Sequence, residues 1–381
     1  MLIKMLKSLL NSAARSREAS DGEPFTAFIT PVPEPHFVTP RETLDADQAS
    51  MRLRVGIPAG QLARSRRVCL VPVEYVERDP SLAALGRVQA IVVGKLPVSF
   101  FVQHATRAQA LLDWVETAAR RHLVVVDFSD DLAAAGQMYG QPVLAEVQRR
   151  LLAAATATVP TSALRDRLAP GARYGVVVIE DPFESAEAGE PRFAPGAVLQ
   201  LAWFGVFGPP LRAMVAGCFA RIARRLAPRP VEVAFVTHRN QAELVREMAS
   251  ELRSLHAGFH MRHVPWSLDA AGRALREADA VVLPQDTQSA WGNVKSHNRL
   301  VETLRAGRFA VASPIPAYRE LENYAWVADD LAEGVEWALD HPAAAVERIV
   351  AGQRHVSERF APERIGALWA DALQLRRERR K

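Results

Sequence analysis

The feature that most constrains this sequence is an alternation of short, valine-rich apolar runs with longer segments that carry apolar residues at helical spacing. Continuous apolar runs bounded by turn residues are typical of buried strands, and the segments between them are typical of amphipathic helices. Strands buried on both faces belong to parallel sheets that helices cover on either side. The sequence therefore predicts an α/β protein built from doubly wound, Rossmann-like sheets.

The alternation occurs twice, and an acidic stretch punctuated by glycine and proline separates the two series after Pro182. The first series predicts strands at residues 53–57, 68–73, 88–94, 123–128, 155–159 and 174–179. The second series predicts strands at residues 198–205, 231–237, 259–264, 280–284, 309–313 and 325–328. The main helices are predicted at residues 106–122, 141–154, 210–226, 241–255, 268–278 and 297–306.

Two domains of this kind suit a chain of 381 residues. We expect a first domain at residues 51–197 and a second at 198–342, facing each other across a cleft. Helices within residues 343–381 are expected to pack back across both domains. Ligands of open α/β sheets bind at the carboxyl ends of the strands, so the cleft is the expected binding site.

Residues 1–50 are expected to lie outside both domains. The first 17 residues place leucine and methionine at helical spacing with lysine and arginine between them. This segment is either an interfacial helix that touches an anionic membrane surface or a packed or frayed terminal helix. Residues 18–50 contain five prolines among acidic and small residues, which predicts a linker or an extended arm, with order beginning at Met51.

Composition and charge disfavour several classes of protein. The net charge is +4, but acidic residues are interspersed nearly everywhere and no basic stripe with aromatic residues appears, so we expect no nucleic-acid partner. Cys69 and Cys218 are too few for a disulfide scaffold, which favours a cytoplasmic location. No apolar run approaches the roughly 20 residues of a transmembrane helix.

Motif spacing narrows the choice of ligand. The sequence contains neither G-x-G-x-x-G nor G-x-x-x-x-G-K-[ST], which disfavours a dinucleotide-dependent dehydrogenase and a P-loop NTPase. It also lacks H-E-x-x-H, so we expect no bound metal and no cofactor. The ligand is therefore sought in the loops at the strand ends.

The most informative segment is residues 278–316, in which a predicted strand, a polar loop, a helix and a further strand follow one another. Ser296 is a candidate N-cap of this helix. Leu300 and Leu304 form its packing face, and Gly307 supplies the left-handed conformation that ends many helices. The helix therefore has a defined start and end.

The start of this helix has the chemistry of an anion site. Its first N–H groups carry partial positive charge, and Lys295 and Arg299 add full charges, which together form a seat for a diphosphate. Glu302 shares a face with Asn298 and is placed one turn deeper, where it can accept hydrogen bonds from a ribose diol. The alternative is a capped, exposed helix with a solvated Glu302.

The stretch K-S-x-N-R-L-V-E-x-L-x-A-G-R-F-x-V-A-S, residues 295–313, resembles the donor-nucleotide segment of GT-B glycosyltransferases, particularly the GT4-like group. In that family the helix start holds the diphosphate of a nucleotide sugar, and the glutamate holds the ribose. The resemblance implies that Glu302 contacts the ribose, and that the phosphates are contacted by Lys295, Ser296, Asn298 and Arg299.

Weaker likenesses follow in the family's order along the chain. Residues 153–168 resemble a strand and helix of the family's first domain, and residues 179–184 resemble the junction that ends it. The strand L-A-W-F-G resembles the family's opening strand of the second domain, which implies that Gly205 lies under the donor phosphates. Many retaining members carry a second acid eight residues before the glutamate, where this sequence has Val294. Retention or inversion of configuration is left open.

The first domain supplies candidates for the acceptor side. Asp127, Ser129, Asp130 and Asp131 follow a predicted strand end, where Asp127 or Asp130 could act as general base and Ser129 or Asp131 could contact the acceptor. The alternative is that these residues cap the next helix. Lys95 also follows a predicted strand and is a candidate contact for an anion, or a surface lysine.

We therefore expect a glycosyltransferase that moves a sugar from a nucleotide sugar to a glycan or lipid-linked acceptor without a metal. Lys295 would stabilise the leaving diphosphate. The alternatives are a nucleotide-sugar epimerase of the same shape and an inactive binding module. The family and the amphipathic, basic ends suggest polysaccharide biosynthesis by a cytoplasmic protein, with peripheral contact at the inner face of the plasma membrane.

Overall fold

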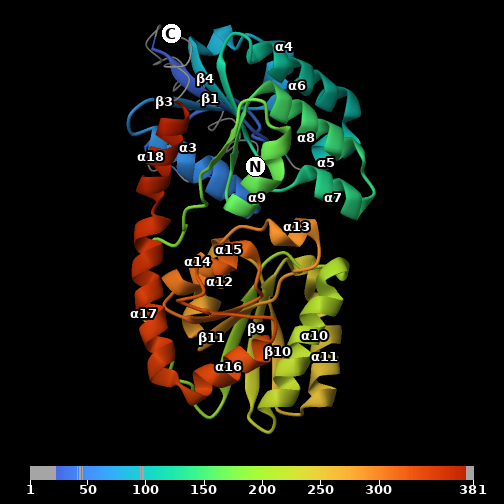
Figure 1. Ribbon diagram of the computed structural model, residues 1–381, viewed down its shortest axis with the longest axis vertical. Coiled ribbons are helices and arrows are strands. Elements are labelled where there is room, and N and C mark those ends of the chain that lie inside the picture. The colour runs from blue at the N-terminus through green and yellow to red at the C-terminus, as the bar shows by residue number, and fades with distance from the viewer. Residues whose placement is uncertain are drawn as a thin grey trace, which may run out of the picture.

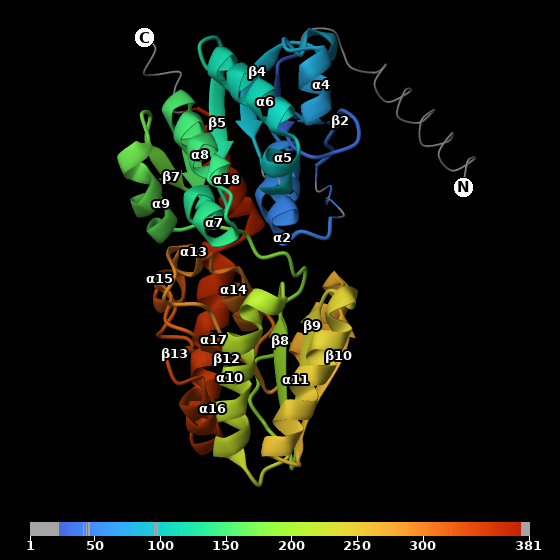
Figure 2. The ribbon, with the colours of Figure 1, turned by 90° about the vertical axis from the view of Figure 1, so that its right-hand side faces the viewer.

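The computed structural model describes residues 23–40, 42, 44, 46–94, 96 and 98–374. These residues form two lobes stacked along the longest axis of the molecule, with one sheet in each lobe (Figures 1 and 2). The amphipathic segment expected at residues 1–17 lies outside the described residues. No helix in the described part of the chain is both long and apolar enough to span a membrane.

The first lobe contains a seven-stranded sheet with the order β2-β3-β1-β4-β5-β6-β7. Every neighbouring pair is parallel except β2 with β3. The strands are β1 (Phe25–Ile29), β2 (His36–Phe37), β3 (Arg67–Val71), β4 (Val88–Val93), β5 (Leu123–Asp127), β6 (Thr156–Val159) and β7 (Val176–Val178).

The second lobe contains a six-stranded parallel sheet with the order β10-β9-β8-β11-β12-β13. Its strands are β8 (Leu199–Phe204), β9 (Val231–Thr237), β10 (Phe259–Pro265), β11 (Ala280–Leu283), β12 (Phe309–Ala312) and β13 (Trp326–Val327). Both strand orders cross over within the sheet, as in doubly wound α/β folds.

Helices cover both faces of each sheet (Figures 1 and 2). Those of the first lobe are α2 (Ala49–Met51), α3 (Ile57–Leu62), α4 (Val73–Arg78), α5 (Val98–Gln103), α6 (Ala105–Ala118), α7 (Leu132–Tyr139), α8 (Val143–Ala154) and α9 (Ser162–Leu168). The second lobe has α10 (Pro209–Leu226), α11 (Ala242–Leu255), α12 (Leu268–Glu277), α13 (Ala290–Asn293), α14 (Asn298–Arg305), α15 (Pro316–Arg319) and α16 (Leu331–Asp340). The last two helices are α17 (Pro342–Arg359) and α18 (Pro362–Ala372).

The valine-rich strands are buried on both faces. In β5, Val124 and Val126 join the core beneath α6 and α8, whereas Val125 between them joins the core beneath α3 and α18. Successive side chains of a strand point to opposite faces, so a strand with helices on both sides needs apolar residues at every position. The prediction of covered parallel sheets is confirmed.

One strand was not predicted. Residues 18–50 were expected to form a linker or an arm, but Phe25–Ile29 forms β1, which is fully buried between β3 and β4. The prolines flank this five-residue run without interrupting it, so its strand character is diluted when composition is averaged over the whole segment. For this stretch the expectation is wrong.

A second difference concerns residues 53–57, which were predicted as a strand. Arg52–Gly56 instead forms a π-helical segment that continues into α3. The prediction rested on a short apolar run bounded by turn residues, and Arg54 stands inside that run. Both Arg52 and Arg54 are buried in ion pairs, so the polar positions do not mark a solvated face.

The two C-terminal helices connect the lobes. α17 packs against α14, α16 and β12 of the second lobe, and α18 packs against α3 of the first (Figure 1). Trp369 of α18 is fully buried beside Phe28, and its ring lies 5.5 Å from the guanidinium carbon of Arg54. The chain thus returns to the first lobe at its end.

Arg54 is the charged centre of this arrangement. Its Nη2 and Nε lie 2.5 and 3.1 Å from the two carboxylate oxygens of Asp127, and its Nη1 lies 3.3 Å from Oδ1 of Asp181. Nη1 also donates to the carbonyl of Ile179. Arg54 therefore joins the π-helical segment before α3, the end of β5 and the start of the connection between the lobes.

Replacing Arg54 by alanine leaves the carboxylates of Asp127 and Asp181 buried without their cation. We expect the free energy of unfolding to fall by about 3–5 kcal/mol, the usual result of breaking one side of a buried ion pair. Urea unfolding measures this change. Arg149→Ala, which removes an exposed i,i+3 pair with Glu146, is the control and should change stability much less, because solvent screens exposed pairs. Equal losses in both variants would contradict the role given to Arg54.

Candidate functional site

The turn that precedes α14 faces the first lobe. It follows α13, which contacts α7, and α15 contacts α9, so this edge of the second sheet meets the first lobe (Figure 2). The hydroxyl of Thr161 donates to the carbonyl of Val294 over 3.4 Å. The predicted diphosphate seat therefore lies where the lobes meet.

Lys295 forms an ion pair across this boundary. Its Nζ lies 2.5 Å from Oδ1 of Asp130 and 3.3 Å from the centre of the Trp291 ring. The other oxygen of Asp130 accepts a hydrogen bond from the hydroxyl of Ser129 at 3.4 Å. Two residues predicted on opposite sides of the site are thus brought into direct contact, and Trp291 holds the lysine from one side.

Gly205 and Arg299 also lie together, as the sequence predicted. Arg299 Nη1 donates to the carbonyl of Phe204 at 3.4 Å, and its guanidinium carbon lies 5.9 Å from the Trp203 ring. Gly205 has a φ of +149°, and a Cβ at this position would lie 3.3 Å from Arg299 Nη1. A larger residue here would be strained and would crowd the guanidinium.

The start of α14 differs in detail from the prediction. The helix begins at Asn298 with His297 as N-cap, and no side chain caps it. Ser296 is therefore not the cap. Its hydroxyl instead hydrogen bonds to Asp181, which opposes the rise in the pKa of that carboxyl caused by burial. Because the first N–H groups of a helix have no partner within the helix, they remain donors for an anion.

Asn298 adds a further donor at the same place. Its Nδ2 is buried and has no hydrogen-bond partner among the described residues.

At the other end of the helix, Gly307 has a φ of +69°, and the N–H groups of Gly307 and Arg308 donate to the carbonyls of Leu304 and Thr303. This is a Schellman motif, so the predicted glycine cap is confirmed.

Glu302 is buried, and the alternative of a solvated glutamate is wrong. Its Oε1 accepts a hydrogen bond of 2.7 Å from the backbone N–H of Glu184, in the connection between the lobes. Burial raises the pKa of Glu302 to about 7, although this hydrogen bond acts in the opposite direction. Glu302 lies one turn from the helix start, and one of its oxygens anchors the connection.

Two of the first-lobe candidates have structural roles. Asp127 has no exposed side-chain surface, since Arg54 and the hydroxyl of Thr158 hold its carboxylate. Asp131 caps α7 through the N–H of Ala134 and pairs with Arg167. The roles expected for Asp127 as base and Asp131 as acceptor contact do not agree with these environments. Lys95 lies outside the described residues. Asp130 and Ser129 therefore remain as the first-lobe candidates for contact with the acceptor.

Several residues of the site were not predicted. His297 is buried, with Nε2 3.2 Å from Oε2 of Glu320, and this neighbouring imidazole, together with Arg359, lowers the pKa of Glu320 to about 2. Arg52 pairs with Glu184 at 2.6 Å, and its guanidinium carbon lies 4.8 Å from the Trp266 ring. For Arg52 the sequence signal was an arginine beside an apolar run. Such an arginine can be buried or exposed, and only its partners in the structure decide which.

Comparison with known proteins adds the fold family. No protein-family model matches the sequence, and a search of curated proteins gives no match. Among solved structures, HepE from Anabaena in complex with UDP and glucose matches with a TM-score of 0.62 and 13% identity, covering 92% of this chain and 99% of that chain. The chain has the GT-B fold.

Two further GT-B structures are similar. Alpha,alpha-trehalose 6-phosphate synthase from Burkholderia multivorans matches with a TM-score of 0.59 and 8% identity over 94% of this chain and 100% of that one. TarM from S. aureus, in complex with fondaparinux, alpha-GlcNAc-glycerol and UDP, matches with a TM-score of 0.57 and 12% identity over 79% and 58%. The GT-B architecture predicted from the sequence, with two tandem Rossmann-like domains, is confirmed.

The raised pKa of Glu302 predicts a pH dependence of stability. The pKa is about 7 in the folded protein, against an ordinary value of 4.5 for glutamate, so the folded state binds more protons between these values. The free energy of unfolding should therefore fall as the pH rises from about 5 to about 7, by roughly 3 kcal/mol at most. Glu302→Gln keeps an acceptor for the Glu184 N–H and should remove this contribution.

The measurement is urea unfolding of both proteins at pH 5 and pH 8. Relative to the wild type, Glu302→Gln should be more stable at pH 8 than at pH 5. Glu247→Gln, on the exposed side of α11, is the matched control. The same pH dependence in the wild type and Glu302→Gln would show that another group is responsible.

Proposed function

We propose that this protein is a glycosyltransferase that uses a nucleotide sugar, with the donor on the second lobe and the acceptor on the first. The observation that carries the proposal is the convergence of cations and helix N–H groups where the lobes meet. Lys295, Arg299 and the first turn of α14 surround this place, and Asp130 reaches it from the first lobe. Such a set of donors suits a diphosphate that gains charge as it leaves.

Uridine diphosphate is the nucleotide to test first. HepE and TarM were solved in complex with UDP, and a synthase from Burkholderia xenovorans that matches with a TM-score of 0.57 and 9% identity is described as UDP-forming. These neighbours share the fold with this chain, and they support glycosyl transfer as its activity. The acceptor class proposed is a glycan or a lipid-linked glycan.

In this proposal the ion pair between Lys295 and Asp130 is exchanged for two contacts with substrates. The donor diphosphate takes Lys295, and its charge is further balanced by Arg299 and the N–H groups of α14. Asp130 then accepts a hydrogen bond from the acceptor hydroxyl and removes its proton or orients it. Glu302 accepts from the ribose, and no step needs a metal.

Two alternative activities would use the same residues. An epimerase of this shape would convert the nucleotide sugar into an isomer without any acceptor, and an inactive module would bind nucleotide without turnover. Incubating the protein with a panel of UDP-, GDP-, ADP- and CMP-sugars, with and without glycan acceptors, separates the three. We expect a new glycosidic product that requires the acceptor.

The exchange of partners predicts opposite effects of two substitutions on the affinity for UDP. Lys295→Ala removes a charge-assisted contact to the diphosphate, and affinity should fall at least about tenfold. Asp130→Asn removes the carboxylate that competes for Lys295, and affinity should rise about two- to fivefold. Isothermal titration calorimetry measures both, with Asp340→Asn at the end of α16 as the control. Weaker binding in Asp130→Asn would count against competition for Lys295.

Turnover provides a second test. With the best nucleotide sugar of the panel, Lys295→Ala and Glu302→Ala should each lower the rate of transfer by at least about tenfold, because each removes a polar contact to the donor. Asp130→Asn should lower the rate although it binds UDP more tightly. If Lys295→Ala and Glu302→Ala both transferred sugar at the wild-type rate, the proposed function would be abandoned.

A further inference from the structure

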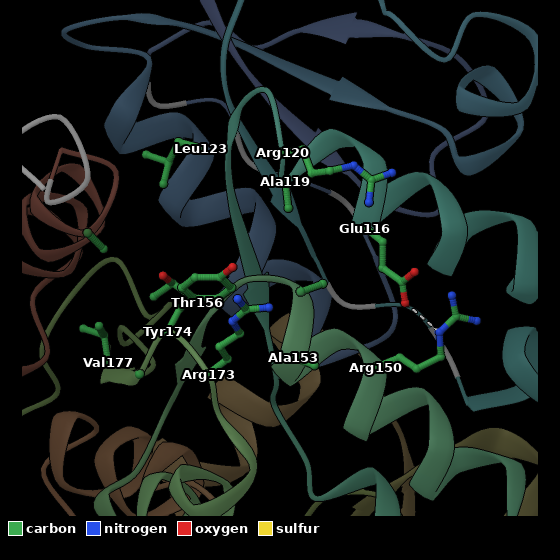
Figure 3. Close-up of a pocket in the computed structure, with 13 residues that line it drawn as sticks. Glu116, Ala119, Arg120, Leu123, Arg150, Ala153, Thr156, Arg173, Tyr174 and Val177 are labelled. Carbon is green, nitrogen blue, oxygen red and sulfur yellow. Dashed lines mark hydrogen bonds and ion pairs between the residues drawn. The ribbon is translucent and has the colours of Figure 1, made fainter. Parts of the chain in front are cut away.

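A large cavity lies at the amino ends of the strands of the first sheet, opposite the carboxyl ends that face the second lobe. It has a volume of about 1030 Å³ and is lined by the ends of α6 and α8, the start of β6 and the loop that leads into β7 (Figure 3). We call it the edge groove, and its polar lining consists of Glu116, Arg120, Arg150, Thr156, Arg173 and Tyr174. In a parallel sheet the amino ends of the strands share one edge. The groove therefore lies opposite the edge that carries Asp130.

The charge of the edge groove is positive. Its lining side chains include three arginines and a single carboxylate, that of Glu116. Arg150 is fixed by Glu116 and by Asp113 outside the groove, each at 2.7 Å, so its guanidinium is already oriented. Arg173 and Arg120 are exposed and enter the groove from two different elements. Arginine pairs with carboxylates and phosphates through two parallel hydrogen bonds, so the groove suits an anionic ligand.

The groove also offers an aromatic surface. Tyr174 is 39% exposed, and the guanidinium carbon of Arg173 lies 5.3 Å from its ring. Ala119, Ala153 and Val177 supply apolar lining elsewhere in the groove. A sugar ring presents C–H groups to such a surface and hydroxyl groups to its rim, while a charge on the sugar reaches the arginines. The cavity is at the upper end of the range for small-ligand pockets and has room for several linked sugars.

We propose that the edge groove binds a segment of an anionic oligosaccharide, whose carboxylate or phosphate groups pair with Arg173 and its neighbours while one sugar ring lies against Tyr174. Binding here does not involve Lys295, Glu302 or Asp130 and is independent of nucleotide binding where the lobes meet. A longer acidic glycan held in the groove would raise the local concentration of its free end near the protein.

The test uses the full chain and calorimetric titration with four probes. These are a hexamer of galacturonic acid, neutral maltohexaose, glucose 6-phosphate and inorganic phosphate. We expect the hexamer to bind, maltohexaose to bind at least tenfold more weakly, and the affinity for the hexamer to fall with added salt. Glucose 6-phosphate should bind more tightly than inorganic phosphate, because only it carries a sugar ring.

Arg173→Ala and Tyr174→Ala should each weaken binding of the hexamer at least fivefold and leave the affinity for UDP unchanged. Both residues are exposed, so both variants should unfold at the wild-type temperature. Arg246→Ala, an exposed arginine of α11 paired with Glu243, is the matched control and should bind as the wild type does. Loss of UDP binding in Arg173→Ala or Tyr174→Ala would contradict the independence of the two sites, whereas a wild type that does not bind UDP would be a separate failure, of the proposed function.

Three results would overturn the proposal. The first is equal binding of the hexamer by the wild type, Arg173→Ala and Tyr174→Ala. The second is inorganic phosphate binding as tightly as the hexamer, which would indicate a site for simple anions. The third concerns Ala372, which lines the groove two residues before the last described one. If a protein that ends at Gln374 bound the hexamer at least tenfold more tightly, the groove would belong to the chain's own last residues.

Discussion

The arrangement of the site depends on one buried charge, the guanidinium of Arg54. A charge taken out of water must be paired, and here two carboxylates and a carbonyl surround it. One carboxylate, of Asp127, comes from the end of a strand, and the other, of Asp181, comes from the connection between the lobes. Trp369 of the last helix closes the remaining side. The same interaction that fixes the connection thus removes Asp127 from contact with solvent and from any chemistry.

The three aspartates at the end of β5 have the same side chain but different partners. Asp127 faces Arg54, Asp131 faces the first turn of α7 and Arg167, and Asp130 alone of the three faces the second lobe. A carboxylate that already accepts two or three strong hydrogen bonds in a buried place has no capacity for a substrate. Asp130 instead pairs with Lys295. In the proposed function an anionic ligand takes over Lys295, and Asp130 then loses this partner.

The sequence predicted most of the strands and helices because burial on both faces leaves a clear pattern, as in Val124–Val126 of β5 and in α14 with its terminal Gly307. It failed where polar residues are buried. The run that contains Arg54 was predicted as a strand, but Arg52 and Arg54 are held in buried ion pairs. Ser296 was predicted as a helix cap, but its hydroxyl hydrogen bonds to Asp181. For the site, proximity within one segment was predictable, as for Asn298 and Glu302 of α14. The pairing of Lys295 with Asp130 depends on two residues 165 positions apart, and no local pattern carries that information.

If α14 binds the donor as proposed, this binding is coupled to the arrangement of the lobes. Lys295, just before α14, holds Asp130 of the first lobe, and Glu302, one turn into α14, holds the backbone of Glu184 in the connection. The carboxylate of Glu184 in turn holds Arg52 beside α3. An anion that takes Lys295, or a hydroxyl that takes Glu302, must replace contacts that define how the lobes meet. Its affinity therefore differs between lobe arrangements, and a ligand favours the arrangement that it binds more tightly.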